Sequence, residues 1–567
     1  LKGGFIMKKK TLLLALLLCL FTFTACGKGE EKKAENGKPA AESGEASLDK
    51  DQYYMGHIGA EPVTLDAQVG QDSYSKNIIS NVYEPLVQIH EVEENKLEVE
   101  PAGAESYDVS DDGLVYTFHL RDFEWEDGQA VTAGDYEYGI KRAADPDTAA
   151  QAAFLLDPIK NFKAVNSGEM AVDELGVKAV DDKTLEITLE APAEYFIKIV
   201  PYRVMYPQRK DMVEKYGDSF GSSTDGIISC GPFKVTDWTH NSEVNLVKND
   251  TYWNKDNIKL EKINYRILND INTVGNAFDV GEIDSMSTSI KEWTDKLDDK
   301  EGVHWYPFIR PTLDFMTINT ENKLMSNKKI RQAIQVGLDR DGLNKQVYSG
   351  VNTDCTGWVP PTINLGEKPY SEQIGFKPLD DLIDSVDDPK ELFIEGLKEL
   401  GMDPDPSKVT LEYKVSNTAD LKGANEYIQA NLKEALGVNV DIVTLEWPVL
   451  SNAMDKGDFQ ISYSAWSTDY DDPYAMLSMF LTDAGVITTN WSNPEYDKLV
   501  KEASETTDTK EAAEKYGEAE KILIEESPVI PIANVTHHKF RYDYLKGLPV
   551  SELDTTGLRY VYTSGRN

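Results

Sequence analysis

Apolar residues recur with strand or helix spacing along nearly the whole chain from residue 52 onward. Alternating apolar and polar positions, and short apolar runs rich in β-formers, predict strands at 52–58, 114–120, 184–190, 233–238, 243–248, 409–415, 438–445 and 459–465. Apolar positions at helical spacing predict helices at 74–83, 133–143, 328–338, 420–436 and 510–525. Because strands and helices alternate, we predict an α/β fold whose ligand sites lie at strand ends and domain junctions.

The first 25 residues have the pattern of a secretory signal peptide. Met7 is followed by three Lys, and an apolar stretch over 11–24 leads into Ala25 and Cys26. This stretch is too short and wrongly flanked for a permanent transmembrane helix. Residues 1–6 resemble an over-extended start, so we expect the protein to begin at Met7. We predict a cleaved signal over 1–25 and, over 26–50, a flexible tether rich in Gly, Lys, Glu, Ala, Ser and Pro.

The composition is strongly acidic. The chain has 58 Lys and Arg against 98 Asp and Glu, a formal net charge of −40. So acidic a composition does not favour the basic surface that nucleic acid requires, so we expect no nucleic-acid partner. The chain is too long for one core and favours two or three domains. Of its four Cys, Cys230 and Cys355 lie in the folded part, and an oxidising compartment permits a bridge between them without requiring one.

The stretch 458–473, D-F-Q-I-S-Y-S-A-W-S-T-D-Y-D-D-P, is the strongest candidate for a site. A buried strand over 459–465 is followed by Trp466 and then by a turn that contains Asp469. A carboxylate at the end of a rigid strand can point into a cleft and neutralise a ligand cation. The alternative is a solvated acidic turn, which is common in so acidic a chain.

Patterns of catalytic or metal-binding residues are weak. The chain has neither H-E-x-x-H nor Cys-x-x-Cys. His537 and His538 are adjacent and would point to opposite faces of a strand, so they would chelate one ion poorly. The turn at Asp469 lacks the spacing and central Gly of a calcium loop. We therefore predict a binding protein, not an enzyme, with no cofactor and no metal.

Several segments, taken in order over 53–562, resemble the large solute-binding proteins of ABC importers that carry oligopeptides, dipeptides and a few other cargoes. The matching segments are P-V-T-L-D-A-Q at 62, N-V-Y-E-P-L-V at 81, the stretch 114–136, A-D-P-D-T-A at 144, S-C-G-P-F-K-V at 229, N-D-T-Y-W-N at 249, G-E-I-D at 281, N-K-K-I-R-Q-A-I-Q-V-G-L-D-R at 327, W-S-T-D-Y-D-D-P at 466 and S-N-P-E-Y-D-K-L-V at 492. Alanine and Cys at 25–26 also resemble a bacterial lipobox, although Phe23 stands where such boxes usually have Leu.

The resemblance implies a periplasmic-binding-protein-like α/β fold of two hinged lobes and an extra domain. Lobe I would comprise 51–83, 208–310 and 536–567. The extra domain II would comprise 84–207, and lobe III would comprise 311–535.

The resemblance also implies a mechanism, in which the lobes close around an extended peptide and Asp469 holds its α-ammonium group. The other implied ligand-binding positions are Trp466, Ser467, Thr468, Tyr470, Gln71, Ser73 and Phe154. The family's acid near the first strand is replaced at Gln71 and Ser73, and its Tyr pair at Ala152 and Phe154. Its Arg aligns near Tyr463, with no cation in that strand, so fixed recognition of a peptide carboxylate is not expected.

The implied partners are an oligopeptide, the permease of an ABC transporter, and a membrane reached through lipid on Cys26. We expect a monomer anchored at the outer face of the cell membrane. Two alternatives remain at this stage. In the first, the same fold binds a different cargo: a nickel chelate, haem, a sugar or a signalling peptide. In the second, the protein is a sensor or adhesin without a transport role.

Overall fold

The computed structural model describes residues 47–566 except 71, 94–95, 349, 418–420, 483 and 485. The predicted signal peptide, Cys26, most of the predicted tether and Gln71 lie outside the described residues. The described chain mixes helices with three sheets of at least four strands, which confirms the predicted α/β class.

The first sheet, called here the N-terminal sheet, joins segments that are far apart in sequence. Its strand order is β1-β10-β9-β8 (Tyr53–Ile58, Lys262–Ile267, Glu243–Lys248 and Phe233–Thr239). β1 pairs in parallel with β10, and the other pairs are antiparallel. The predicted β8–β9 hairpin turns through Asn241, whose φ of 58° is left-handed. Helix α1 (Ser73–Val82) begins at Asp72, whose carboxylate accepts from the backbone N–H groups of Tyr74 and Ser75.

The second sheet, called here the inserted sheet, lies between β1 and β8 in the sequence. Its strand order is β4-β5-β7-β6 (Ala104–Val109, Val115–Leu120, Thr184–Thr188 and Val177–Asp181), all antiparallel. Helix α2 (Ala133–Ala144) packs on β6 and β7 and starts with a capping box between Thr132 and Asp135. A separate hairpin joins β2 and β3 (Val87–Glu93 and Lys96–Pro101).

The large sheet has the strand order β11-β18-β12-β17-β15-β16. Its strands span Ser285–Thr288, Val529–Tyr542, Val303–Ile318, Ile461–Ser467, Thr410–Ser416 and Asn439–Leu445. The predicted helices here are α8, α13 and α17 (Lys328–Gly337, Lys422–Leu436 and Thr509–Glu526). Further helices are α6 (Ile271–Asp279), α7 (Lys291–Leu297), α9 (Arg340–Gln346), α11 (Pro378–Asp384), α12 (Pro389–Glu399), α14 (Trp447–Asp455) and α16 (Pro494–Glu505).

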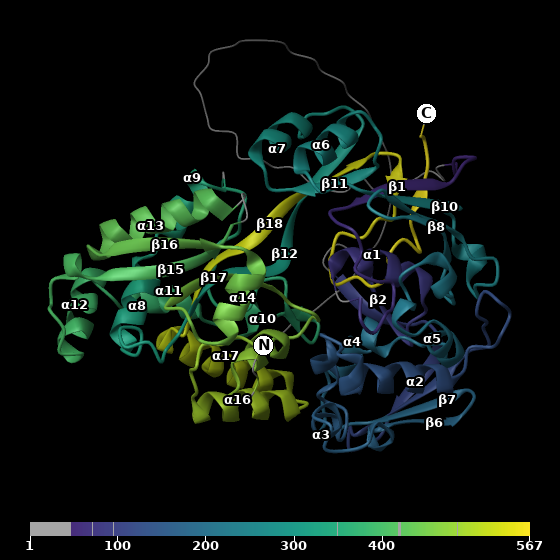
Figure 1. Ribbon diagram of the computed structural model, residues 1–567, viewed down its shortest axis with the longest axis horizontal. Coiled ribbons are helices and arrows are strands. Elements are labelled where there is room, and N and C mark those ends of the chain that lie inside the picture. Colours follow the sequence, from purple (N-terminus) through teal and green to yellow (C-terminus); the bar gives the residue numbers. More distant parts are fainter. Residues whose placement is uncertain are drawn as a thin grey trace, which may run out of the picture. The chain divides into compact units, whose positions relative to one another are not determined.

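Two long strands, β12 and β18, run side by side through the large sheet (Figure 1). Their pairing shifts between Ile309 and Leu313, so that the strands form two paired halves separated by an irregular segment. Pro311 lies in that segment and cannot donate to a ladder. We call residues 310–312 the β12 bulge. Its Pro311 carbonyl accepts the backbone N–H of Thr468, which ties the bulge to the end of β17.

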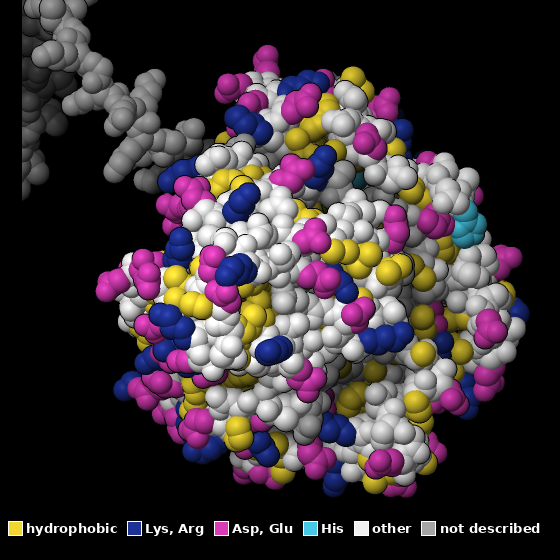
Figure 2. Space-filling model, turned by 60° about the vertical axis from the view of Figure 1, so that its left-hand side comes forward, with side chains coloured by type: hydrophobic (Ala, Val, Ile, Leu, Met, Phe, Trp, Pro, Cys, Tyr) yellow, Lys and Arg dark blue, Asp and Glu magenta, His cyan; other side chains and the backbone are white. Residues whose placement is uncertain are grey.

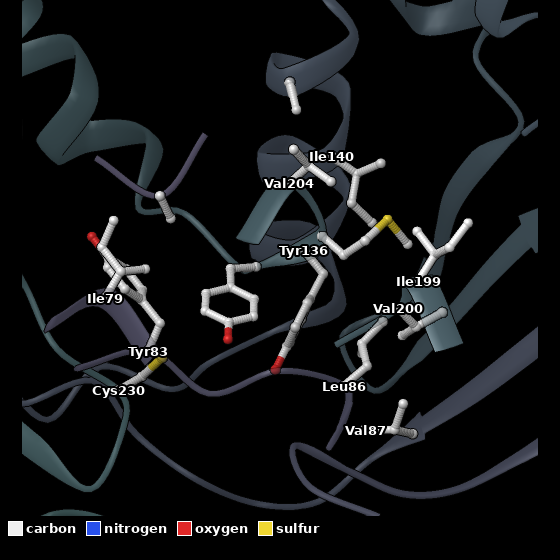
Figure 3. Close-up of a cluster of buried hydrophobic side chains, with 14 of the residues drawn as sticks. Ile79, Tyr83, Leu86, Val87, Tyr136, Ile140, Ile199, Val200, Val204 and Cys230 are labelled. Carbon is white, nitrogen blue, oxygen red and sulfur yellow. The ribbon is translucent and has the colours of Figure 1, made fainter. Parts of the chain in front are cut away.

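A continuous core of buried side chains underlies the N-terminal and inserted sheets. Figure 3 shows part of it, where Val204 lies beside Ile140 and Tyr136 of α2. Val204 and Met205 are almost completely buried, so the segment 202–205 is fixed on this core. On the face drawn in Figure 2, acidic and basic side chains are interspersed.

Two details differ from the sequence analysis or settle what it left open. The predicted strand 459–465 runs instead from Ile461 to Ser467, so Trp466 belongs to the strand and does not follow it. The predicted strand ended two residues too early. β17 continues to pair with β12 as far as Ser467 and Thr312, and the local sequence gives no sign of this tertiary contact. Cys230 and Cys355 are both free and buried.

Candidate ligand-binding site

A cavity of about 230 Å³ lies between two parts of the chain that are distant in sequence. One wall comes from Gln151, Ala152, Phe154 and Leu155 and from residues 202–204. The first group surrounds the short helix η2 (Ala153–Leu156), and the second surrounds η4 (Arg203–Met205). The opposite wall is the end of β17, at residues 465–467, together with Asp469.

The wall that carries Asp469 is held rigidly. β17 pairs with β12 up to Ser467, and Thr468 then donates its backbone N–H to the Pro311 carbonyl. The Thr468 hydroxyl donates to the Tyr470 carbonyl and closes the turn. Asp469 therefore stands on a turn fixed at both sides, and its position is set by backbone contacts.

The Asp469 carboxylate has no hydrogen bond or ion pair with any other residue that the structure describes. Burial raises its pKa from 3.8 to about 6, and the positive charges of Lys76 and Arg203 offset part of that rise. A buried carboxylate without a hydrogen-bond partner is stabilised more by a cationic donor than an exposed carboxylate is, because the donor replaces the water that the buried group has lost.

The two cations near Asp469 come from other elements. Lys76 is on α1, and its Nζ donates to the Glu552 carbonyl at 3.3 Å. Arg203 is on η4, and its Nη1 donates to the Asp72 carbonyl at the start of α1 at 3.3 Å. Burial lowers the pKa of both groups, and their acidic neighbours offset part of that lowering. Only Arg203 of the two lines the cavity.

The rest of the cavity is largely apolar. Phe154 is 42% exposed and presents apolar surface to the cavity. Trp466 lies on the opposite wall, and its buried indole N–H has no acceptor among the described residues. The cavity therefore combines one carboxylate, one guanidinium and an apolar surface.

The structure brings four of the predicted site residues together: Phe154, Trp466, Ser467 and Asp469 line the cavity. Thr468 and Tyr470 are buried behind it, where they hold the turn. Ser73 is exposed at the first position of α1 and is not part of the cavity wall. Gln71 lies outside the described residues, so its position in the site stays a prediction.

The turn after Asp469 contacts the segment that leads into α4 (Phe196–Ile199). Tyr195 stacks on Tyr470, with ring centroids 5.7 Å apart and planes at 11°. Lys198 donates to the Asp471 carbonyl, and its Nζ lies 3.9 Å from Oδ2 of Asp472. The segment 195–198 thus contacts the turn 470–472 directly beside Asp469.

The side chains of Asp471 and Asp472 shape the same turn. Asp471 accepts from the backbone N–H and the side-chain amide of Asn364 at 2.7 and 2.9 Å. Asp472 accepts from the backbone N–H of Tyr474 at 3.0 Å. Of the three carboxylates in the turn, Asp469 is the one that lines the cavity.

Sequence reasoning missed Arg203, Lys76 and Lys198. Each reaches the site through tertiary packing, and the local sequence around each carries no motif. One signal was available for Arg203, since it lies just before residue 207, the predicted end of the extra domain. Residues where a chain passes from one domain to the next often lie beside a cleft.

Other chemistry that the sequence raised is not assembled at this cavity. His537 contacts the Ser287 hydroxyl, and His538 stacks on Trp305 with ring centroids 4.2 Å apart. Gly217–Gly221 matches G-x-S-x-G, a pattern that the sequence analysis overlooked, but Ser219 is exposed in the 3₁₀ turn η5 (Gly217–Ser219) after a helix, not on a strand-to-helix elbow.

Within the residues placed by the structure, His, Cys, Asp and Glu do not gather in groups of three or more suited to a metal ion. Nor does that part of the chain contain a helix with the length and hydropathy needed to span a membrane.

Comparison with known proteins gives consistent matches. The model of the bacterial extracellular solute-binding proteins, family 5 Middle, matches residues 98–487. The oligopeptide-binding protein OppA of Bacillus subtilis is 34% identical over 560 residues, covering 96% of this chain and 97% of the relative. The substrate-binding domain of an oligopeptide ABC transporter from Bacillus anthracis is 31% identical, with a TM-score of 0.76 and coverage of 91% and 99%. OppA of Listeria monocytogenes, solved bound to peptide, is 27% identical, with a TM-score of 0.74 and coverage of 91% and 99%.

Proposed function

Because this chain belongs to the bacterial extracellular solute-binding proteins of family 5, we propose that it captures oligopeptides outside the cytoplasm and delivers them to the permease of an ABC importer. The observation that carries the proposal is the Asp469 carboxylate, which lines the cavity without a hydrogen-bond partner among the described residues. The relatives are named as binding proteins, and we propose a binding role without catalysis.

Asp469 binds the α-ammonium group of the peptide in this mechanism. A buried, unpaired ammonium group is costly, so a single well-placed carboxylate selects strongly for a free amino terminus. The first side chain of the peptide then lies between Phe154 and Trp466. Contacts to the peptide backbone ignore sequence, which permits many peptides to bind.

Closure of the protein around the peptide takes place at the β12 bulge. The division into lobe I (51–83, 208–310 and 536–567), domain II (84–207) and lobe III (311–535) places this bulge at the junction between lobes I and III. Irregular strand segments of this kind absorb backbone rotation more easily than a regular ladder does. The Thr468–Pro311 hydrogen bond supports the assignment, because it connects the bulge to the turn that carries Asp469.

The protein works outside the cytoplasm as a monomeric lipoprotein in this proposal. Supporting features are the basic and apolar pattern over 7–24, Cys26 after Ala25, and a tether over 26–50 that separates the folded part from the membrane.

The decisive experiment is mass spectrometry of the small molecules released when the purified protein is denatured, followed by calorimetry with the peptides found. We expect peptides with free amino termini to be released and to rebind, and the same peptides with acetylated amino termini to bind at least about 100-fold more weakly. Release of a metal chelate, haem or sugar, together with no response to a mixed pool of short peptides, would overturn the proposal.

A further inference from the structure

A second set of contacts joins the segments that carry the two walls of the cavity. Tyr195 stacks on Tyr470, with ring centroids 5.7 Å apart and planes at 11°. The same ring packs on Tyr474, with ring centroids 4.7 Å apart and planes at 30°. Beside these rings, the Lys198 ammonium group contacts the same turn. We call the contact of Tyr195 and Lys198 with residues 470–474 the cross-lobe contact.

The segment that carries Tyr195 and Lys198 is fixed on the core. In α4, Phe196 and Ile199 are almost completely buried. Figure 3 shows Ile199 and Val200 within the buried cluster that also contains α2 residues. Because a close-packed core deforms little, Tyr195 and Lys198 present a rigid surface to the turn.

The opposite side of the contact is buried against this surface. Tyr470 is 5% exposed and belongs to the buried cluster of the N-terminal and inserted sheets, although it follows a strand of the large sheet. Burial raises the pKa of Asp472 to about 6 and also raises that of Asp471, and Lys198 offsets part of both rises. Glu194 adds a further negative charge near Asp472. Separating the two sides would therefore remove the cation from buried carboxylates and expose aromatic rings to water.

The cross-lobe contact does not involve the described residues that line the cavity. That lining comprises 151–152, 154–155, 202–204, 465–467 and Asp469. A peptide in the cavity therefore contacts this lining and not the cross-lobe contact. A contact made away from the ligand contributes the same free energy whichever peptide is bound.

The cross-lobe contact forms only when the protein is closed, in the proposed division of the chain. Residues 195–198 belong to domain II and residues 470–474 to lobe III, so opening at the β12 bulge separates them. A peptide enters before this contact forms and leaves only after it breaks. The contact should therefore act on the dissociation rate and leave the association rate nearly unchanged.

We propose, resting on the peptide-binding function above, that Tyr195 and Lys198 are positioning residues that hold the Asp469 turn in the closed arrangement and slow the dissociation of every bound peptide by the same factor. They make no contact with the peptide and act through residues 470–474. Part of the affinity is then independent of peptide sequence, and the cavity lining supplies the remainder.

Stopped-flow kinetics with two unrelated peptides tests the proposal. The probes are Ala-Ala-Ala-Ala and Lys-Leu-Ser-Val, both with free amino termini and a fluorophore at the carboxyl end, chased with excess unlabelled peptide. We expect Tyr195→Ala to speed the dissociation of both about tenfold, which corresponds to about 1.4 kcal/mol and is the size expected for two lost aromatic contacts. Association rates should stay within about twofold of wild type.

Two conservative variants and one matched control separate this role from a structural one. Tyr195→Phe keeps the ring and Lys198→Arg keeps a cationic donor, so both should dissociate within about twofold of wild type. Lys183→Met is the control, because Lys183 also donates to a backbone carbonyl and pairs with a carboxylate, at 3.0 Å each, but both partners lie within domain II. If Tyr195→Ala does not fold, Lys198→Met removes the other half of the contact and should speed both dissociations about threefold.

Unchanged dissociation of both peptides from Lys198→Met and from any folded Tyr195→Ala would overturn the proposal. So would factors that differ more than about threefold between the two peptides, or a change confined to the association rate. Each of these results leaves the proposed function intact, because the peptides still bind. Absence of binding of both probes, and of the peptides released from the denatured protein, would contradict the proposed function and this inference with it.

Discussion

Replacing Asp469 by Asn separates the ligand-binding role of this residue from its effect on stability. The side chain keeps its shape but loses the charge that would neutralise a peptide ammonium group. Removing one partner of a buried, hydrogen-bonded charge pair costs about 2–5 kcal/mol, so peptide affinity should fall at least about 30-fold. The peptide ammonium would be left without a partner, since Lys76 and Arg203 repel it.

The same change should stabilise the ligand-free protein. Burial raises the pKa of Asp469 from 3.8 to about 6, which means that ionising this carboxylate at pH 7 opposes folding. The difference corresponds to about 3 kcal/mol at pH 7, and partial exposure to water reduces it to about 1–2 kcal/mol. The destabilisation is complete above about pH 6 and disappears below pH 3.8, so the two proteins should converge in acid.

Isothermal titration calorimetry measures the affinity, and denaturant unfolding of peptide-stripped protein at several pH values measures the stability. Asp441→Asn is the matched control, because it is the same substitution at an exposed position on β16. Unchanged peptide affinity for Asp469→Asn would refute the ammonium assignment. A ligand-free variant less stable than wild type at pH 7 would refute the electrostatic account of the turn.

Three further predictions follow from the same contacts. Peptide affinity should fall about tenfold between pH 7 and pH 5, since Asp469 with a pKa of about 6 becomes protonated there; a flat profile by calorimetry in the wild type, or the same slope in Asp469→Asn, would contradict this. Lys198→Met, which removes the contact to the Asp471 carbonyl, should speed peptide dissociation about threefold or more in stopped flow with little change in melting temperature; an unchanged dissociation rate would show that the contact does not hold the closed state. Glu520→Leu should lower the free energy of unfolding by about 3 kcal/mol, because the buried carboxylate accepts from two backbone N–H groups and a Tyr hydroxyl; a loss below 1 kcal/mol in urea titration would show that these groups find other partners.

The elements of this fold were accessible from sequence where the signal is local. β9 over 243–248 and α2 from Ala133 were predicted almost to the residue, because apolar alternation and capping residues define them. The end of β17 was misplaced by two residues, because its last pairs with β12 depend on a strand about 150 residues away. The β12 bulge was not predicted at all, although Pro307 and Pro311 within one strand are a recognisable signal.

The candidate site divides in the same way. Asp469 was found from sequence because a strand, an aromatic residue and a carboxylate stand together in one segment. Arg203 was not, because nothing around it distinguishes a cavity cation from a surface one, and its position depends on Val204 and Met205 packing into a core built from α2. The sequence showed only that the strand around Tyr463 holds no cation, and Arg203 reaches the cavity wall from a different segment.

In the proposed mechanism, the turn 468–472 connects the bound ligand to the hinge at the β12 bulge. The backbone N–H of Thr468 donates to the Pro311 carbonyl in the β12 bulge. The other end of the turn contacts Tyr195 through ring stacking and Lys198 through a hydrogen bond. In the proposed mechanism, a ligand bound to Asp469 favours the arrangement in which both walls of the cavity, at 151–155 and 202–204 and at 465–469, lie against it. Binding energy at one carboxylate can therefore shift the hinge equilibrium, in proportion to the difference in affinity between the open and closed arrangements.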